Sequence, residues 1–318
     1  MTDLNFEQLA ADCLINRTEN GEKSNELLDK LEEKLNEYQF ISVVNYFFEI
    51  SNDYVVISHL LKKINKYKSQ SSVSPLVDAL VQKEKYKNKI QDAEIQTLIR
   101  VNVAKVLANL KDNSAVNPLL YCLNNKGENY KLRLSCAEAL GKIGDKYAVL
   151  PLSEVLKDET EHSVYLKESA AFALGMIGDM NAVEPLVNIL ETKKGIMDKF
   201  TFLKERAIEA LSKINFKNDR VFNALKNSLK DESVQVRVNA IEALSTMDDE
   251  RVPKILYSCL NDKSDEVIRN AIIALFNISG EQILYDILND YSLPEQTMKI
   301  IREIIQEIEE CEDEENFE

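Results

Sequence analysis

Glycine and proline are scarce in this chain, at 8 and 6 of its 318 residues. A turn-rich all-β fold needs both residue types at its tight turns, so their scarcity favours helices joined to helices. The chain has 2 histidines and 5 cysteines, and no two cysteines form a Cys-x-x-Cys pair. The sequence therefore offers little for a histidine-based catalytic triad, and it predicts neither a zinc site nor a disulfide framework.

Long apolar runs and a basic overall charge are also missing. No stretch stays apolar for about eighteen residues, as a membrane span requires, and the N-terminus lacks a basic segment followed by an apolar one. The net charge is −15, and nine acidic residues lie between Glu303 and Glu318. A phosphate backbone attracts the opposite charge. We therefore expect a cytoplasmic protein that binds neither nucleic acid nor a membrane.

A repeated segment runs through most of the chain. Residues 139–145 read Ala-Leu-Gly-Lys-Ile-Gly-Asp, and residues 173–179 differ from them at one position. The leucine of this segment, which we call the marker leucine, recurs in steps of 33, 34, 37, 33 and 31 residues, as Leu107, Leu140, Leu174, Leu211, Leu244 and Leu275. Prolines follow it after eleven residues in three repeats, as Pro118, Pro151 and Pro185. The shared phase of two residue types indicates a true structural repeat.

Each repeat is predicted to form two helices. Proline suits the first turn of a helix, where its missing N–H is not needed, so the first helix is expected to begin at the proline. The marker leucine lies on the apolar stripe of the second helix. Gly144 and Gly178 could belong to a phosphate-binding loop or could end the second helix in a left-handed conformation. No strand precedes them and no Gly-Lys-Ser/Thr follows, so we interpret them as helix ends.

The motif Ala-Leu-Gly-x-Ile-Gly-Asp followed by Ala-Val-x-Pro-Leu resembles the HEAT repeat, in particular the phycobilisome (PBS) lyase type. The resemblance covers roughly residues 74–290. It implies an all-α fold, an α-α superhelix of about six to seven helical pairs whose second helices line a concave groove. We expect three parts: degenerate helical repeats or an N-terminal cap at 1–72, the HEAT-like array at 73–290, and a capping helix with an acidic tail at 291–318.

In this family an aspartate and an arginine of successive repeats form a ladder along the array. Asp231 and Arg237 match its Asp…Val-Arg pattern, and Arg133, Arg206 and Arg269 stand at similar positions, whereas the aspartates are less regular. The resemblance gives these residues a structural role.

Aromatic residues fall in or near the connections between the two helices of four successive repeats. These connections, at about 82–93, 124–131, 158–165 and 191–203, look longer than the later ones at about 230–235 and 261–266. Their side chains either cover the start of the second helix or form a rim that contacts a partner protein. The candidate partner-binding residues are Tyr86, Tyr130, Tyr165, Ile196, Met197, Phe200 and Phe202.

Lysines gather around the first of these connections. They are Lys62, Lys63, Lys66 and Lys68, followed by Lys83, Lys85, Lys87 and Lys89. We interpret them as a solvated face; the alternative is a patch that steers an acidic protein partner.

Two functions are consistent with the resemblance. The first is a non-enzymatic scaffold or chaperone-like adaptor that binds another protein through its groove and loops, without a cofactor, catalytic residue or metal. The second is a bilin lyase or bilin-handling subunit, with a transiently bound linear tetrapyrrole. A HEAT-like enzyme, deoxyhypusine hydroxylase, holds iron with His-Glu pairs, but neither His59 nor His162 precedes a glutamate. HEAT-like DNA glycosylases use a basic groove that contains tryptophan. This chain has a net charge of −15 and no tryptophan, so it is not expected to be one of them.

Overall fold

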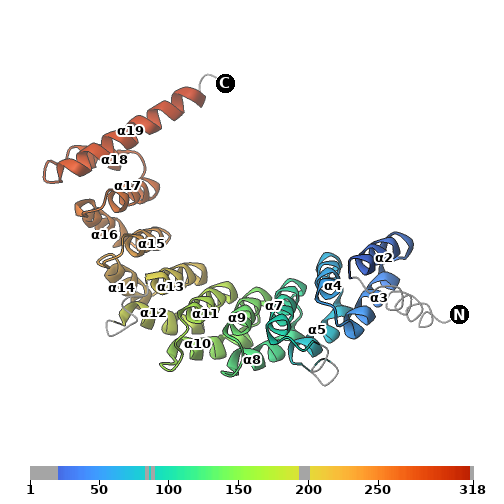
Figure 1. The fold of residues 1–318 in the computed structure, drawn as a ribbon. Coiled ribbons are helices and arrows are strands. Elements are labelled where there is room, and N and C mark those ends of the chain that lie inside the picture. The colour runs from blue at the N-terminus through green and yellow to red at the C-terminus, as the bar shows by residue number, and fades with distance from the viewer. Residues whose placement is uncertain (1–20, 83–85, 87–89, 193–200, 316–318) are drawn as a thin grey trace. The chain divides into compact units, whose positions relative to one another are not determined.

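The computed structural model describes residues 21–82, 86, 90–192 and 201–315. Within these ranges the regular elements are all helices, with no strand (Figure 1). The chain divides into two compact units, Met1–Asp179 and Met180–Glu318, which we call the N-terminal and C-terminal units and describe separately.

The N-terminal unit contains nine described α-helices. They are α2 (Gly21–Lys34), α3 (Glu37–Ile50), α4 (Tyr54–Tyr67), α5 (Val73–Leu80), α7 (Ala93–Leu110), α8 (Val116–Asn124), α9 (Tyr130–Ile143), α10 (Val149–Lys157) and α11 (Val164–Ile177). Short 3-10 turns precede three of these helices, at Gln70–Ser72, Asn113–Ala115 and Lys146–Ala148.

The C-terminal unit contains eight described α-helices. They are α12 (Val183–Glu191), α13 (Thr201–Ile214), α14 (Asp219–Ser228), α15 (Val234–Ser245), α16 (Val252–Ser258), α17 (Asp265–Ser279), α18 (Gln282–Leu288) and α19 (Glu295–Glu315). Its 3-10 turns are Met180–Ala182 and Cys259–Asn261.

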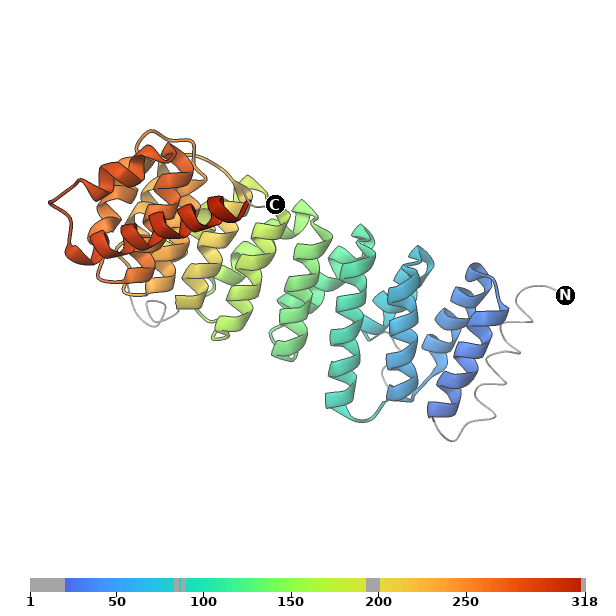
Figure 2. The same cartoon turned by 90° about the horizontal axis from the view of Figure 1, so that it is seen from above.

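Consecutive helices pack as pairs, and the pairs stack. In the N-terminal unit α5 pairs with α7, α8 with α9 and α10 with α11; in the C-terminal unit the pairs are α12 with α13, α14 with α15 and α16 with α17. We call the members of each pair its first and second helix. The second helices of the N-terminal unit stand side by side, since α9 packs against both α7 and α11 (Figures 1 and 2). The predicted all-α solenoid of stacked helix pairs is confirmed.

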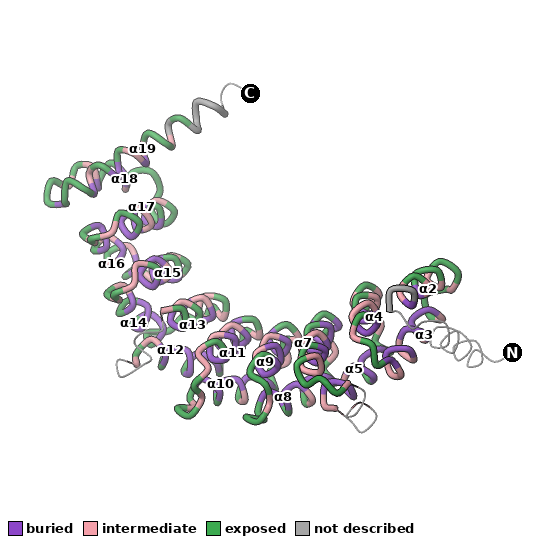
Figure 3. The backbone as a smooth tube through the Cα atoms, in the orientation of Figure 1, coloured by how far each residue is buried: buried purple, intermediate pink, exposed green. Residues whose placement is uncertain are grey.

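The hydrophobic core lies between the first and second helices of each unit (Figure 3). All six marker leucines are buried there, with at most 3 % of their surface exposed. A helix pair alone would leave one side of each helix uncovered, so each pair is stabilised by the next one in the stack.

The repeat glycines end two second helices. Gly144 ends α9 with φ of 81° and Gly178 ends α11 with φ of 72°, in the left-handed region that glycine adopts without strain. The Asp145 carboxylate then accepts a hydrogen bond from the backbone N–H of Tyr147 and caps the following 3-10 turn.

The prolines lie in the opening turn of the first helices but do not begin them. Helices α8, α10 and α12 start two residues before Pro118, Pro151 and Pro185, directly after a 3-10 turn. The predicted start at the proline was therefore two residues late. The proline remains within the first turn, where the backbone N–H groups need no intrahelical acceptor.

Gly141 serves a different purpose, because it lies where α9 crosses α11. A Cβ atom at this position would stand 2.6 Å from the Cα atom of Ala173. The two second helices therefore approach each other so closely that only a hydrogen atom fits at residue 141.

Buried basic side chains form a ladder that includes Arg133 and Arg237, two of the arginines placed in it from sequence. They lie seven residues before the marker leucines, and four of them pair with a carboxylate of the next repeat: Arg100 with Glu128, Arg133 with Glu161, Lys204 with Asp231 and Arg237 with Asp262, at 2.7 to 2.8 Å. The fifth, Lys167, donates to the backbone oxygen of Asp158 at 2.8 Å, and burial lowers its pKa. The four ion pairs thus connect a second helix to the connection between the first and second helix of the next repeat.

Two of the arginines placed in the ladder from sequence do not belong to it. Arg206 forms a surface pair with Glu209 in its own helix, and Arg269 pairs with Glu303 and Glu307 of α19. They lie five and six residues before the marker leucine instead of seven. At about 100° per residue along a helix, this offset turns them from the core edge toward solvent.

Candidate functional site

Tyr86, the first candidate contact residue, lies against its own unit. Its hydroxyl group donates a hydrogen bond to the backbone oxygen of Pro75 at 3.2 Å, and its ring packs against Phe48 with 6.3 Å between centroids. Burial, together with the nearby carboxylates of Glu49 and Asp78, raises the pKa of Tyr86 well above its usual value. The ring is half-buried. The structure therefore gives Tyr86 a packing contact, and its role in partner binding stays a prediction.

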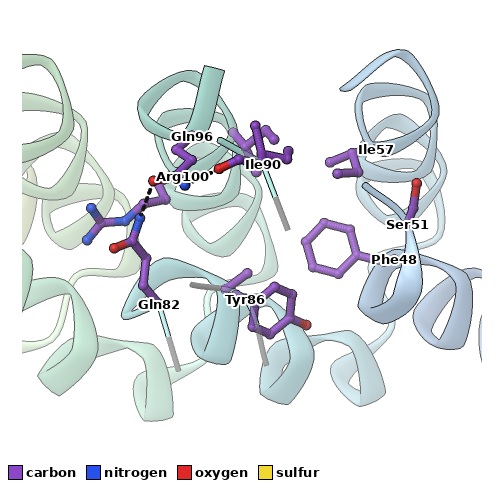
Figure 4. A pocket seen from close by; sticks show the side chains of 10 residues that line it. Phe48, Ser51, Ile57, Gln82, Tyr86, Ile90, Gln96 and Arg100 are labelled. Carbon is purple, nitrogen blue, oxygen red and sulfur yellow. Dashed lines mark hydrogen bonds between the residues drawn. The ribbon is translucent and has the colours of Figure 1, made fainter. Parts of the chain in front are cut away.

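A small pocket lies beside this ring, between the pairs α3–α4 and α5–α7 (Figure 4). Its polar groups bond to one another: the Gln82 amide donates to the Gln96 side chain at 3.1 Å, the Gln96 amide donates to the Ile90 carbonyl, and Arg100 Nε donates to the Leu80 carbonyl at 2.7 Å. The cavity volume is about 40 Å³. Sites for small organic ligands measure about 300–1,000 Å³, so this pocket has room for water but not for a tetrapyrrole.

Three other candidate aromatic residues lie in the first turn of a second helix. Asn129 and Ser163 cap α9 and α11, so Tyr130 and Tyr165 are helical residues and not loop residues. Phe202 is the second residue of α13. The exposed fractions of Tyr130, Tyr165 and Phe202 are 51 %, 68 % and 70 %. These rings are therefore available to a partner; the remaining candidates, Ile196, Met197 and Phe200, lie outside the described residues.

Two of the four connections predicted to be long are of ordinary length. Helix α8 ends at Asn124 and α9 begins at Tyr130, which is the same separation as that between Ser228 of α14 and Val234 of α15. The connection from α10 to α11 is as long as that from α16 to α17, which includes a 3-10 turn. The predicted continuous rim of four long connections is therefore wrong, because helical turns begin earlier than the sequence suggested.

Sequence reasoning assigned a groove to the second helices but did not name the residues of their solvent-facing surface. This surface consists of the positions nine, six and two residues before the marker leucine and two residues after it, which we call the outward face. In α7, α9 and α11 every one of these side chains is exposed or half-buried. They are Leu98, Val101, Lys105 and Asn109 on α7, Lys131, Leu134, Glu138 and Lys142 on α9, and Tyr165, Glu168, Phe172 and Met176 on α11.

Half of these twelve side chains are apolar, although the face of a helix that points to water is usually polar. The same positions in the C-terminal unit differ. On α13, α15 and α17 they hold four glutamates, Glu205, Glu209, Glu242 and Glu266, and three apolar residues, of which Val238 is buried. The apolar outward face is thus a property of the N-terminal unit.

Two of the four lysines on or next to α4, Lys63 and Lys66, are engaged within the N-terminal unit, whereas Lys62 and Lys68 are exposed. Lys63 and Lys66 both contact the Glu32 carboxylate of α2, and Tyr67 donates a hydrogen bond to it at 2.7 Å. Burial alone would raise the pKa of Glu32, but these three donors outweigh it and lower the pKa to about 2. These lysines therefore hold α2 on α4. Lys83, Lys85, Lys87 and Lys89 lie outside the described residues.

The described part of the chain contains neither of two further kinds of site. None of its helices combines the length and apolarity that a membrane span requires. In the same ranges, no three His, Cys, Asp or Glu side chains come together in a group that could hold a metal ion.

Comparison with known families identifies the repeats. Residues 95–165 and 194–276 match the model for HEAT repeats, and residues 166–192 match the model for the PBS lyase HEAT-like repeat. No curated protein matches the chain.

Solved structures of helical-repeat proteins are similar to the chain at low identity. Kap121p is 14 % identical with a TM-score of 0.52, and the aligned region covers 92 % of this chain and 37 % of Kap121p. The complex of CpcE and CpcF of phycocyanin lyase from Nostoc sp. PCC7120 is 20 % identical with a TM-score of 0.45, covering 74 % and 94 % of the two chains. Human deoxyhypusine hydroxylase is 15 % identical with a TM-score of 0.35, covering 88 % and 98 %. The similarity to Kap121p supports the fold and carries nothing about function.

Proposed function

Because this chain is a HEAT-repeat protein, we propose that it is a scaffold that binds another protein through the outward face of its second helices and the exposed aromatic residues at their N-terminal ends. The observation that carries this proposal is the apolar character of the outward face on α7, α9 and α11. Soluble helices rarely leave such a face to water, and contiguous apolar surface marks binding sites.

The exposed rings support a protein as the partner. Tyr165 and Phe202 are among the most exposed large hydrophobic residues of the described chain. Aromatic side chains are favoured anchors of protein interfaces because they bury a large area and lose little conformational freedom. The net charge of −15 disfavours a nucleic acid as the partner.

Affinity capture from a lysate of the source organism, followed by mass spectrometry, tests this proposal. The baits are the intact chain, Tyr165→Ser and Phe202→Ser; both variants change exposed side chains, so their melting temperatures should match that of the intact chain. We expect one protein to be enriched by the intact chain and lost with at least one variant. Equal enrichment by all three baits would contradict the proposed surface, and no enrichment even after chemical cross-linking would contradict the scaffold.

A second candidate function is bilin handling, favoured by the match of residues 166–192 to the PBS lyase HEAT-like repeat. The 40 Å³ cavity beside Tyr86 could not enclose a linear tetrapyrrole. A second cavity of the N-terminal unit, beside Arg133 and Asp158, measures about 280 Å³, just below the range of about 300–1,000 Å³ for such ligands, so the pigment would have to extend over an open surface. Mixing the purified chain with a linear tetrapyrrole and recording its visible absorbance tests this function. A shifted and sharpened band supports it, and an unchanged spectrum rejects it.

A further inference from the structure

The apolar residues of the outward face form a band across three adjacent helices of the N-terminal unit. Leu98 and Val101 lie on α7, Leu134 lies on α9, and Phe172 and Met176 lie on α11. Val101 and Leu134 occupy the same position relative to their marker leucines, so they are neighbours across the α7–α9 contact. Leu98 and Met176, near the two ends of the band, are each 43 % exposed.

The length of the band matches a short helix. Neighbouring packed helices have axes about 8–10 Å apart, so the two steps from α7 to α11 span about 16–20 Å. Leu98 and Met176 are also offset by 11 positions relative to their marker leucines, about 16 Å along the helix axes, so the band is about 23–26 Å long. A helix rises about 1.5 Å per residue, so a partner helix of about 15–17 residues would span it. Its apolar stripe would cover the band.

Lysines flank the band on α7 and α9. Lys105 lies one turn after Val101, and Lys131 and Lys142 lie on either side of Leu134 along α9. All three are exposed, and no ion pair recorded among the described residues includes them. Two carboxylates, Glu138 and Glu168, share the outward face. This face is thus net basic on a chain of net charge −15, whereas its counterpart on α13, α15 and α17 is net acidic.

Resting on the proposed scaffold function, we infer that the α7–α9–α11 outward face is a docking site for an acidic amphipathic helix of a partner protein. The apolar face of that helix covers Leu98, Leu134 and Met176. Its carboxylates lie against Lys105, Lys131 and Lys142, where opposite charges accelerate association and select the partner.

Three fluorescent 16-residue peptides provide the probes. The first is a leucine–glutamate helix with leucines at every third or fourth position, the second replaces each glutamate by lysine, and the third scrambles the first so that no apolar stripe remains. Fluorescence anisotropy measures their binding to the intact chain at low and moderate salt. We expect the acidic amphipathic peptide to bind at least about 10-fold more tightly than the other two, with affinity falling as salt is added.

Two variants locate the site. Leu134→Glu places a carboxylate in the centre of the band and should lower the affinity for the acidic peptide by about 30-fold. Lys131→Glu/Lys142→Glu changes two exposed side chains, should leave the melting temperature close to that of the intact chain, and should weaken binding of the same peptide by about 10-fold. The matched control is Lys226→Glu/Lys254→Glu on the first helices α14 and α16, which changes two exposed lysines and should leave the affinity unchanged within about 2-fold.

Several results would overturn this inference. They are the absence of binding by the acidic peptide up to about 1 mM, equal binding of the acidic and basic peptides, or binding unaffected by both variants. A concentration-dependent dimer in sedimentation that Leu134→Glu abolishes would assign the face to a second copy of the chain instead. If a partner identified by affinity capture still binds Leu134→Glu, the docking site is wrong while the scaffold function stands.

Discussion

Replacing Arg133 by methionine tests the ladder at its most enclosed ion pair. Arg133 Nη1 lies 2.7 Å from Glu161 Oε2, and the two side chains are 9 % and 8 % exposed. Arg133 Nε also donates to the backbone oxygen of Leu123 at 2.8 Å. The substitution removes both bonds and leaves a carboxylate in a site shielded from water.

The expected loss in the free energy of unfolding follows from the unpaired charge of Glu161. Removing one member of a buried ion pair costs about 3–5 kcal/mol, and the Leu123 carbonyl loses its donor as well. The Glu161 carboxylate keeps a hydrogen bond from the backbone N–H of Ser163 at 3.0 Å, which places the estimate near the lower end, about 3 kcal/mol. The double variant Arg133→Met/Glu161→Gln removes the charge too and should lose about 1 kcal/mol.

The loss should depend on pH with a defined sign. Burial alone would raise the pKa of Glu161, but the Ser163 N–H and Arg133 outweigh it and hold the pKa below 4.5. A lowered carboxyl pKa stabilises the fold above the unfolded-state pKa, and this stabilisation is lost as pH falls through the folded-state pKa. In Arg133→Met the pKa of Glu161 is no longer lowered by the arginine. The loss in free energy of unfolding relative to the wild type should therefore be full at pH 7 and should shrink below about pH 4.5.

Urea unfolding followed by circular dichroism at pH 7 and pH 4 measures these differences. Arg206→Met, which removes an exposed pair, is the matched control and should lose at most about 0.5 kcal/mol. A loss below about 1 kcal/mol for Arg133→Met, or the same loss at both pH values, would refute the reasoning.

Four further variants test other parts of the fold. Gly141→Ala should lower the free energy of unfolding by about 2 kcal/mol despite the better helix propensity of alanine, because its Cβ atom would stand 2.6 Å from the backbone of α11. At Gly144 a Cβ atom would meet no neighbour, so Gly144→Ala should lower the free energy of unfolding by only about 1 kcal/mol, through the strain of its φ of 81°. Urea unfolding distinguishes the two variants. Lys204→Met should lower the melting temperature more than Arg206→Met, because only the lysine pairs with a ladder carboxylate; equal shifts would contradict the register. Glu32→Gln should lose about 1 kcal/mol at pH 7, and the deficit should vanish as pH falls from 4.5 to about 2, where the wild-type carboxyl takes up its proton; thermal unfolding against pH checks this.

The repeat could be predicted from sequence because it has a simple physical cause. A leucine that must enter the core once per helix pair recurs with the length of the pair, and Gly144 marks the end of the helix because other residues are strained there. Two members of the ladder, Lys167 and Lys204, were missed because lysine takes the place of arginine there. Counting seven residues back from every marker leucine would have found the basic position.

The candidate surface was predicted less well, since exposure depends on the neighbouring helices. Tyr86 and Tyr165 look alike in sequence, yet one ring packs on Phe48 and the other points to solvent. The band around Leu134 did leave a signal, because apolar residues stand at outward positions where a helix of this kind should be polar. Recognising this signal requires the arrangement of the stacked helix pairs, because it shows which side of each helix is covered by the next pair.

Site-specific photo-cross-linking in cells of the source organism tests the central claim most directly. A photoreactive phenylalanine replaces Tyr165 on the outward face of α11 or, as the control, Tyr147 before α10; the two residues are 68 % and 67 % exposed and both lie in the N-terminal unit. The account predicts a discrete adduct with one other protein from position 165 and none from position 147. No adduct at position 165, or the same adduct from both positions, would contradict binding through the outward face.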